Sequence, residues 1–147
     1  MSIFDVNWSL VASHLLTLGT AYLLALPIGL DREAATRSMG LRTFPLVAIA
    51  SCGMVLIGIH SFGIDSDPLA RILQGIMVGI GFVGGGAIMK DEGYVRGTAT
   101  AASIWTTGAI GTAVALHRYE IAIVLSALTF ATLRLVKPLK QAVVDKN

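Results

Sequence analysis

Three ionisable residues, Asp31, Arg32 and Glu33, stand together directly after a long apolar run. Carboxylate oxygens suit a hard cation such as Mg²⁺, and Asp91 and Glu92 could supply two more carboxylates. The basic residues expected on the same side outnumber the acidic ones: Arg32, Arg37, Arg42, Lys90 and Arg96. This excess favours a salt-bridged network, or a surface that attracts anions, over a cation site. It leaves open whether any metal binds.

We expect a charged cluster at one mouth of the folded chain, formed by Asp31, Arg32, Glu33, Arg42, Lys90 and Arg96. Carboxylates at the C-terminal end of a helix oppose the helix dipole, so they need a cationic partner or a helix that continues beyond them. Ionisable groups close to hydrocarbon are costly and usually paired. The sequence therefore predicts that Arg42 or Arg96 pairs with Asp31 or Glu33. The alternative is ordinary solvated loop charge.

Glycine is unusually dense in the apolar stretch GIMVGIGFVGGG, whose six glycines are Gly75, Gly79, Gly81, Gly84, Gly85 and Gly86. Small residues let membrane helices approach closely, so Gly75, Gly79, Gly81 and Gly85 predict a helix packed against several neighbours. Gly75 and Gly79 are four residues apart, as are Gly81 and Gly85, and these two pairs lie on different faces of the helix. We therefore expect one neighbour to be a second copy of the chain. The alternative is a helix broken at residues 84–86 beside a polar cavity. A phosphate-binding loop is not expected, since no Gly-Lys-Ser/Thr ending follows.

The apolar run at about residues 98–116 carries a stripe of small and hydroxyl-bearing residues along one face. The stripe consists of Thr100, Ser103, Thr107 and Gly111, and Trp105 lies on nearly the opposite face. Hydroxyls in a helix commonly donate to a carbonyl of their own preceding turn. Hydrogen bonding between helices is a second interpretation, and the lining of a cavity a third. Ser103 has no histidine placed to activate it, and no nucleophile–base pair or metal-ligand set is visible. We therefore expect no enzyme activity and no cofactor.

The composition indicates that a membrane positions these residues. Of the 147 residues 54% are hydrophobic and 14% charged, whereas soluble domains carry about 25% charged residues. The net charge of +2 is too small and too scattered to predict a nucleic-acid partner. Five apolar runs are long enough to cross a bilayer, at about residues 9–30, 43–64, 70–89, 98–116 and 119–136. We expect an all-α, single-domain bundle of five transmembrane helices without a soluble C-terminal domain.

Positive charge predicts how such a bundle is oriented, since cytoplasmic loops of membrane proteins carry the excess of Lys and Arg. With the N-terminus outside, the inner side holds nine basic residues: Arg32, Arg37, Arg42, Lys90, Arg96, Arg134, Lys137, Lys140 and Lys146. The outer side then holds Arg71 and Arg118. We therefore expect an external N-terminus and a cytoplasmic C-terminus.

Three segments, LPIGLDRE, GLRTFPLVAIASCGMVL and GIGFVGGGAIMKDEGYVRGTATAASIWTTGAIG, resemble the MgtC/SapB family of bacterial inner-membrane proteins. The resemblance covers residues 26–111 and extends more loosely to both ends. Asp31 departs from the family's usual Glu, and Gly85 from a common Ala. The positions of this chain that match the family's motifs, and that the resemblance therefore implies are functional, are Arg32, Glu33, Arg42, Thr43, Gly81, Gly84, Gly86, Lys90, Arg96, Gly97, Thr100, Ala101, Ala102 and Trp105.

The resemblance implies a bacterial inner-membrane protein of the kind associated with growth at low magnesium and with survival inside host cells. We expect a non-catalytic protein in membrane lipid that supports adaptation to magnesium limitation by acting on other membrane proteins. The alternative is a small oligomeric transporter or channel for a cation such as magnesium. In either case a homo-oligomer, a dimer or higher, is expected.

Overall fold

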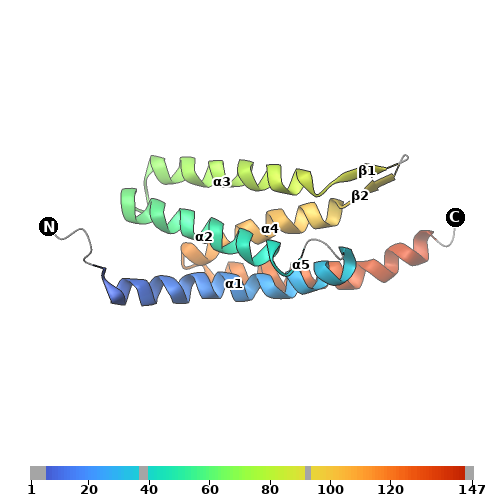
Figure 1. The fold of residues 1–147 in the computed structure, drawn as a ribbon, viewed down its shortest axis with the longest axis horizontal. Helices are drawn as coiled ribbons and strands as arrows, with labels where there is room; N and C mark the ends of the chain where they lie inside the picture. Colours follow the sequence, from blue (N-terminus) through green and yellow to red (C-terminus); the bar gives the residue numbers. More distant parts are fainter. Residues whose placement is uncertain (1–5, 37–39, 92–93, 145–147) are drawn as a thin grey trace.

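The computed structural model describes residues 6–36, 40–91 and 94–144. Five helices follow one another along the chain, joined by short turns and, before the fourth helix, by a small hairpin. The helices are α1 (Trp8–Thr36), α2 (Thr43–Phe62), α3 (Asp67–Gly86), α4 (Thr98–Ala115) and α5 (Tyr119–Val144). They alternate in direction, so the two termini lie at opposite ends of an elongated bundle (Figure 1). The expected all-α fold is confirmed.

Four of the helices are long and apolar enough to cross a membrane: α1 over Trp8–Ala35, α2, α3, and α5 over Tyr119–Val136. Helix α4 has 18 residues, carries more small and hydroxyl-bearing side chains, and lies at the centre of the bundle. It packs against all four other helices, and Ile104, Ile110 and Val114 on it are fully buried. A helix surrounded by protein needs close-fitting side chains more than a uniformly lipid-like surface.

The outer helices form a wall around α4 that is open on one side. Helix α3 packs on α2, α2 on α1, and α1 on α5. In Figure 1, α3 lies on one side of the α2 and α4 pair, and α1 and α5 lie on the other side. Helices α3 and α5 therefore face each other across α4 and leave part of its surface uncovered.

Helix α3 runs unbroken through its glycine-rich stretch and ends at Gly86. The helix break considered for residues 84–86 is not formed, and the third apolar run ends three residues earlier than expected. An antiparallel hairpin follows instead, which the sequence did not predict: β1 (Met89–Asp91) pairs with β2 (Tyr94–Arg96). Gly97 closes this hairpin at φ +85°, where a Cβ would collide with the carbonyl oxygen of Ala87, so only glycine fits there.

The closest approach between helices is made by glycines of α4. At Gly111 a Cβ would collide with the carbonyl oxygen of Ala48 on α2, and at Gly108 with the Ile80 side chain of α3. The contact at Gly111 is between backbone and backbone, which is the close approach that small residues permit in membrane helices. The bundle is therefore held together most tightly along α4.

The glycines of α3 mostly face away from the rest of the chain. Added Cβ atoms at Gly75, Gly79, Gly81, Gly85 and Gly86 would meet nothing within 4 Å. Gly84 is different, since a Cβ there would lie 3.1 Å from the carbonyl oxygen of Ala101 on α4. Packing within the chain through Gly75, Gly79, Gly81 and Gly85 is therefore a wrong prediction. Contact of these glycines with a second copy stays a prediction.

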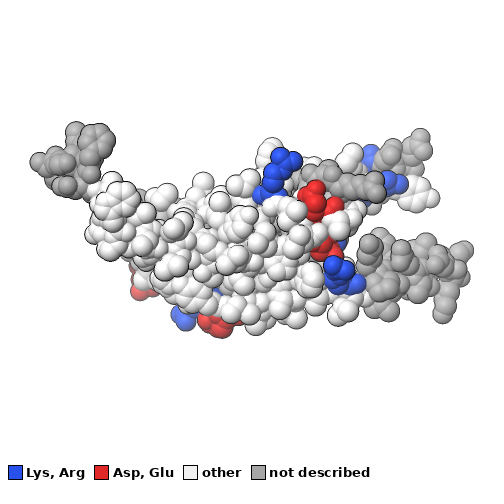
Figure 2. Space-filling view, turned by 60° about the horizontal axis from the view of Figure 1, so that its bottom comes forward, with Lys and Arg blue, Asp and Glu red and all other residues white. Residues whose placement is uncertain are grey.

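Charged side chains lie toward the two ends of the bundle, with an uncharged surface between them (Figure 2). We call one end the basic end; its described charged side chains are Asp31, Arg32, Glu33, Arg42, Lys90, Arg96 and Arg134. The opposite end carries Asp65, Asp67, Arg71, Arg118 and Glu120. Counted over these described side chains alone, five cations against two anions give the basic end a net charge of +3, and two cations against three anions give the opposite end −1; the side chains of Asp91, Lys137 and Lys140 lie outside the described ones.

Candidate functional site

Asp31 is the centre of a buried ion-pair network at the basic end. Helix α1 continues past its apolar run to Thr36, so Asp31 and Arg32 lie within the helix and are only 8% and 7% exposed. The Arg32 guanidinium donates to Oδ2 of Asp31, from Nε at 3.1 Å and also from Nη2. Arg134 Nε lies 3.2 Å from the other carboxylate oxygen, Oδ1. Two guanidinium groups therefore share one buried carboxylate, which offsets part of its desolvation cost.

Arg134 reaches this network from α5. Its side chain is 64% exposed, and its guanidinium carbon lies 5.7 Å from the centre of the Phe130 ring, one turn earlier on the same helix. This cation–π contact with Phe130 orients the largely exposed Arg134 side chain toward Asp31. Arg134 thus connects the end of α5 to the end of α1.

Glu33 connects α1 to the start of α2. One of its carboxylate oxygens accepts a hydrogen bond from the backbone N–H of Leu41 at 3.1 Å. Gly40 lies so close that a Cβ would collide with the backbone of Glu33 and of Gly29. A glycine at position 40 is therefore a steric requirement of this contact, which brings the GLDRE and GLRT segments together.

The predicted partners of the acidic residues are wrong. Within the described part of the chain the ion pairs of Asp31 are made by Arg32 and Arg134, and neither Arg42 nor Arg96 pairs with Asp31 or Glu33. Arg42, at the start of α2, is exposed, as are Lys90 and Arg96 on the hairpin. Arg134 was not predicted as a partner of Asp31, although its position among the cations expected on the inner side was a usable signal.

The arrangement offers little to a metal ion. No group of three or more His, Cys, Asp or Glu side chains that could hold a metal occurs in the ranges that the structure describes. Both oxygens of Asp31 are engaged by guanidinium groups, and Glu33 is engaged by a backbone N–H. Arg37, Glu92 and Lys146, which entered the charge argument, lie outside the described residues. The site can instead attract anions, because Arg42, Lys90 and Arg96 are exposed beside a neutralised Asp31.

The hydroxyl stripe of α4 serves its own helix. Ser103 Oγ donates to the carbonyl oxygens of Ala99 and Thr100 at 2.8 and 2.9 Å, and Thr107 Oγ1 donates to that of Ser103 at 2.8 Å. Ser103 and Thr107 are buried, so local bonding satisfies them without a partner helix. A hydroxyl bond between helices comes from elsewhere: Ser126 Oγ of α5 donates to the Leu24 carbonyl of α1 at 2.7 Å.

Comparison with known proteins identifies the family. The model of the MgtC family matches residues 18–142, which include α2, α3, α4, the hairpin and the ion-pair network. The chain belongs to the MgtC family. No solved structure matches it.

Curated relatives of this MgtC-family chain extend beyond it. It is 36% identical over 134 residues to protein MgtC of Brucella abortus (strain 2308), covering 91% of this chain and 56% of that protein. Protein SapB of Bacillus subtilis (strain 168) is 33% identical over 123 residues, covering 78% and 53%. The Escherichia coli (strain K12) protein named "Putative magnesium transporter YhiD" is 31% identical over 127 residues, covering 82% and 59%. The chain thus spans a little over half the length of these three relatives.

Proposed function

We propose that this MgtC-family chain crosses the bacterial inner membrane five times, with its N-terminus outside and its basic end in the cytoplasm. Helix α4 has 18 residues, or about 27 Å at 1.5 Å per residue, close to the ~30 Å of bilayer hydrocarbon. Because α4 packs against all four other helices, it crosses wherever they cross. The excess of Lys and Arg at the basic end supports the orientation.

We further propose that the protein supports adaptation to low magnesium without catalysis, by binding other membrane proteins at its basic end. The observation that carries this proposal is the neutralisation of Asp31 by Arg32 and Arg134. The exposed Arg42, Lys90 and Arg96 then give this end a net positive field, which repels Mg²⁺ and attracts acidic partners. The magnesium connection rests on the family and on the name of the E. coli relative, "Putative magnesium transporter YhiD".

Growth of a deletion strain at low magnesium, complemented with variants, tests this proposal. Replacing Arg42, Lys90 and Arg96 together by Gln should abolish complementation while leaving the protein folded, because all three side chains are exposed and unpaired within the described residues. A control replaces Arg71, which is exposed at the opposite end, by Gln and should complement fully. Full complementation by the triple variant would contradict a role for the basic end.

A second candidate is an oligomeric transporter or channel for a cation such as magnesium. It is favoured by the uncovered glycines of α3, which fit a close contact with a second copy of the chain, and a pore could form between copies. Both candidates therefore include self-association through α3. Mg²⁺ flux into liposomes that contain purified protein separates them: flux above that of empty liposomes supports transport, and its absence supports the non-transporting role.

A further inference from the structure

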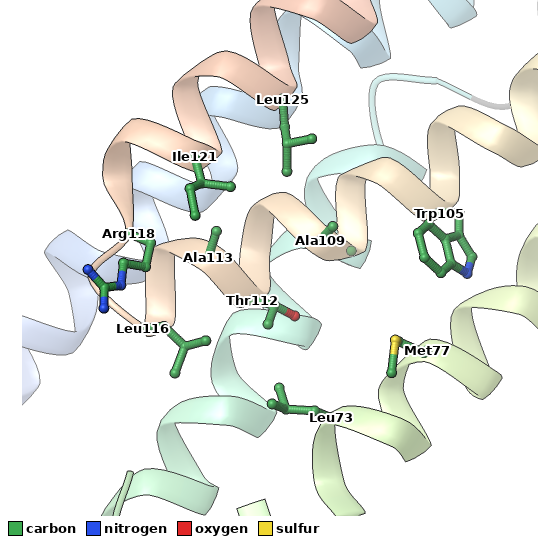
Figure 3. Close-up of a pocket in the computed structure, with 11 residues that line it drawn as sticks. Leu73, Met77, Trp105, Ala109, Thr112, Ala113, Leu116, Arg118, Ile121 and Leu125 are labelled. Carbon is green, nitrogen blue, oxygen red and sulfur yellow. The ribbon is translucent and has the colours of Figure 1, made fainter. Parts of the chain in front are cut away.

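The opening in the helix wall around α4 forms an apolar groove. It has a volume of about 310 Å³ and follows α4 from Trp105 to Leu116. Figure 3 shows its two sides, with side chains of α3 across from side chains of α5: Leu73 and Met77, and Ile121 and Leu125. The lining is mostly apolar, and Thr112 adds a hydroxyl to it.

The dimensions of the groove match one acyl chain of one leaflet. Leu116 follows Trp105 by eleven residues, which at 1.5 Å per residue gives about 16 Å, against ~15 Å for half of the ~30 Å hydrocarbon core.

The Arg118 guanidinium lies at one end of the groove, the end farther from the basic end of the bundle. Figure 3 shows Arg118 at one end and Trp105 at the other. Arg118 is exposed and forms no ion pair with any described residue. It directly precedes α5, where the helix dipole also favours an anion, although Glu120 in the first turn offsets part of this attraction.

We propose that this groove binds one anionic phospholipid from the leaflet at the Arg118 end. One acyl chain lies along α4 between α3 and α5, and the phosphate contacts the Arg118 guanidinium. A phosphate and a planar guanidinium form bidentate hydrogen bonds. A zwitterionic lipid offers the same phosphate but brings its own cation near Arg118, so the anionic lipid binds more tightly.

Quenching of Trp105 fluorescence tests the proposal in vesicles that contain the full chain. The exposed Trp8 is first replaced by Phe, so that emission comes from Trp105 alone. Phosphatidylglycerol brominated on its acyl chains is then titrated into unbrominated phosphatidylcholine, in parallel with brominated phosphatidylcholine. We expect phosphatidylglycerol to quench at about fivefold lower mole fraction, the effect of one basic residue near an anionic headgroup.

Three variants make the result specific. Arg118→Gln should remove the preference for phosphatidylglycerol, whereas Arg71→Gln, at the same end of the bundle but outside the groove, should keep it. Ala109→Leu fills the groove from its floor and should reduce quenching by phosphatidylglycerol to the level of phosphatidylcholine. Equal quenching by both lipids in the parent, equal effects of the two arginine variants, or an unchanged preference in Ala109→Leu would each overturn the proposal.

Discussion

Helices α3 and α4 are adjacent in sequence and both rich in small residues, yet most glycines of α3 face away from the rest of the chain, whereas two glycines of α4 contact neighbouring helices. On α4, Gly108 and Gly111 lie where a Cβ would collide with a neighbouring helix. On α3, Gly75, Gly79 and Gly85 lie where a Cβ would meet nothing. Glycine in a membrane helix thus marks a surface made for close approach, but the partner can be inside the chain or outside it. We infer that α4 organises the fold and that α3 offers its glycines to another molecule.

Of the substitutions that test this difference between α3 and α4, Gly111→Leu should have the largest effect on folding. The side chain would enter the backbone of α2 at Ala48, which cannot yield as a flexible side chain does. Overpacking in a tight core costs about 1–3 kcal/mol, and collision with backbone exceeds that. We expect little or no folded protein, measured as the monodisperse fraction after purification in mild detergent. A normal yield of folded protein would contradict the close contact between Gly111 of α4 and Ala48 of α2.

Gly108→Ala should have a smaller effect, because the first obstacle is movable. Its Cβ would collide with the end of the Ile80 side chain, while Ser51 Oγ lies at 3.4 Å. Rotation of Ile80 can relieve most of the clash, so we expect a loss of about 1 kcal/mol. Reversible unfolding in a detergent titration measures the loss, and the double variant Gly108→Ala with Ile80→Val should recover part of it.

Two neighbouring glycines of α3 provide a matched pair. A Cβ at Gly84 would lie 3.1 Å from the carbonyl oxygen of Ala101, and a Cβ at Gly85 would meet nothing within 4 Å. We expect Gly84→Ala to destabilise the fold and Gly85→Ala to stabilise it by up to about 1 kcal/mol, the difference in helix propensity. The same unfolding titration compares them, and equal effects of the two substitutions would contradict the orientation of α3.

Gly79→Leu should leave folding intact and have a clear effect on assembly. A Cβ at position 79 meets nothing within 4 Å, so the free energy of unfolding should not fall, and the better helix propensity of Leu should raise it by up to about 1 kcal/mol. Self-association should weaken, because the added side chain separates two α3 helices and forfeits their dispersion contacts. The monomer fraction in nanodiscs measures this, with Ile57→Ala on α2 as a control for lipid-facing substitutions.

The sequence predicts where the helices of this fold lie along the chain, but not which face each helix turns toward the rest of the protein. Apolar runs of the right length locate the helices because hydrocarbon thickness sets their length. The face that each helix turns inward is not recoverable in the same way, because lipid and protein interior are equally apolar and no polar side marks the exterior. For this reason the glycines of α3 were expected to pack within the chain.

The candidate site was predictable in composition but not in pairing. The segment from Asp31 to Glu33 is visible as charge beside an apolar run. Its partner Arg134 lies 103 residues later, and the contact depends on how α5 rests on α1, which packing and the bond from Ser126 to Leu24 determine. The hairpin was missed because each strand has three residues, too few to show a periodic pattern.

Disulfide trapping in native membranes tests most directly whether the glycine surface of α3 meets a second copy. Gly79→Cys and Gly85→Cys are each made in a Cys52→Ser background and oxidised, with Ile57→Cys, exposed on α2, as the control. A disulfide requires Cβ atoms about 4 Å apart, so random encounters form it slowly. We expect rapid covalent dimers from a cysteine on α3 and few from a cysteine at position 57. Equal rates from α3 and from position 57, or no dimer from either α3 position, would contradict it.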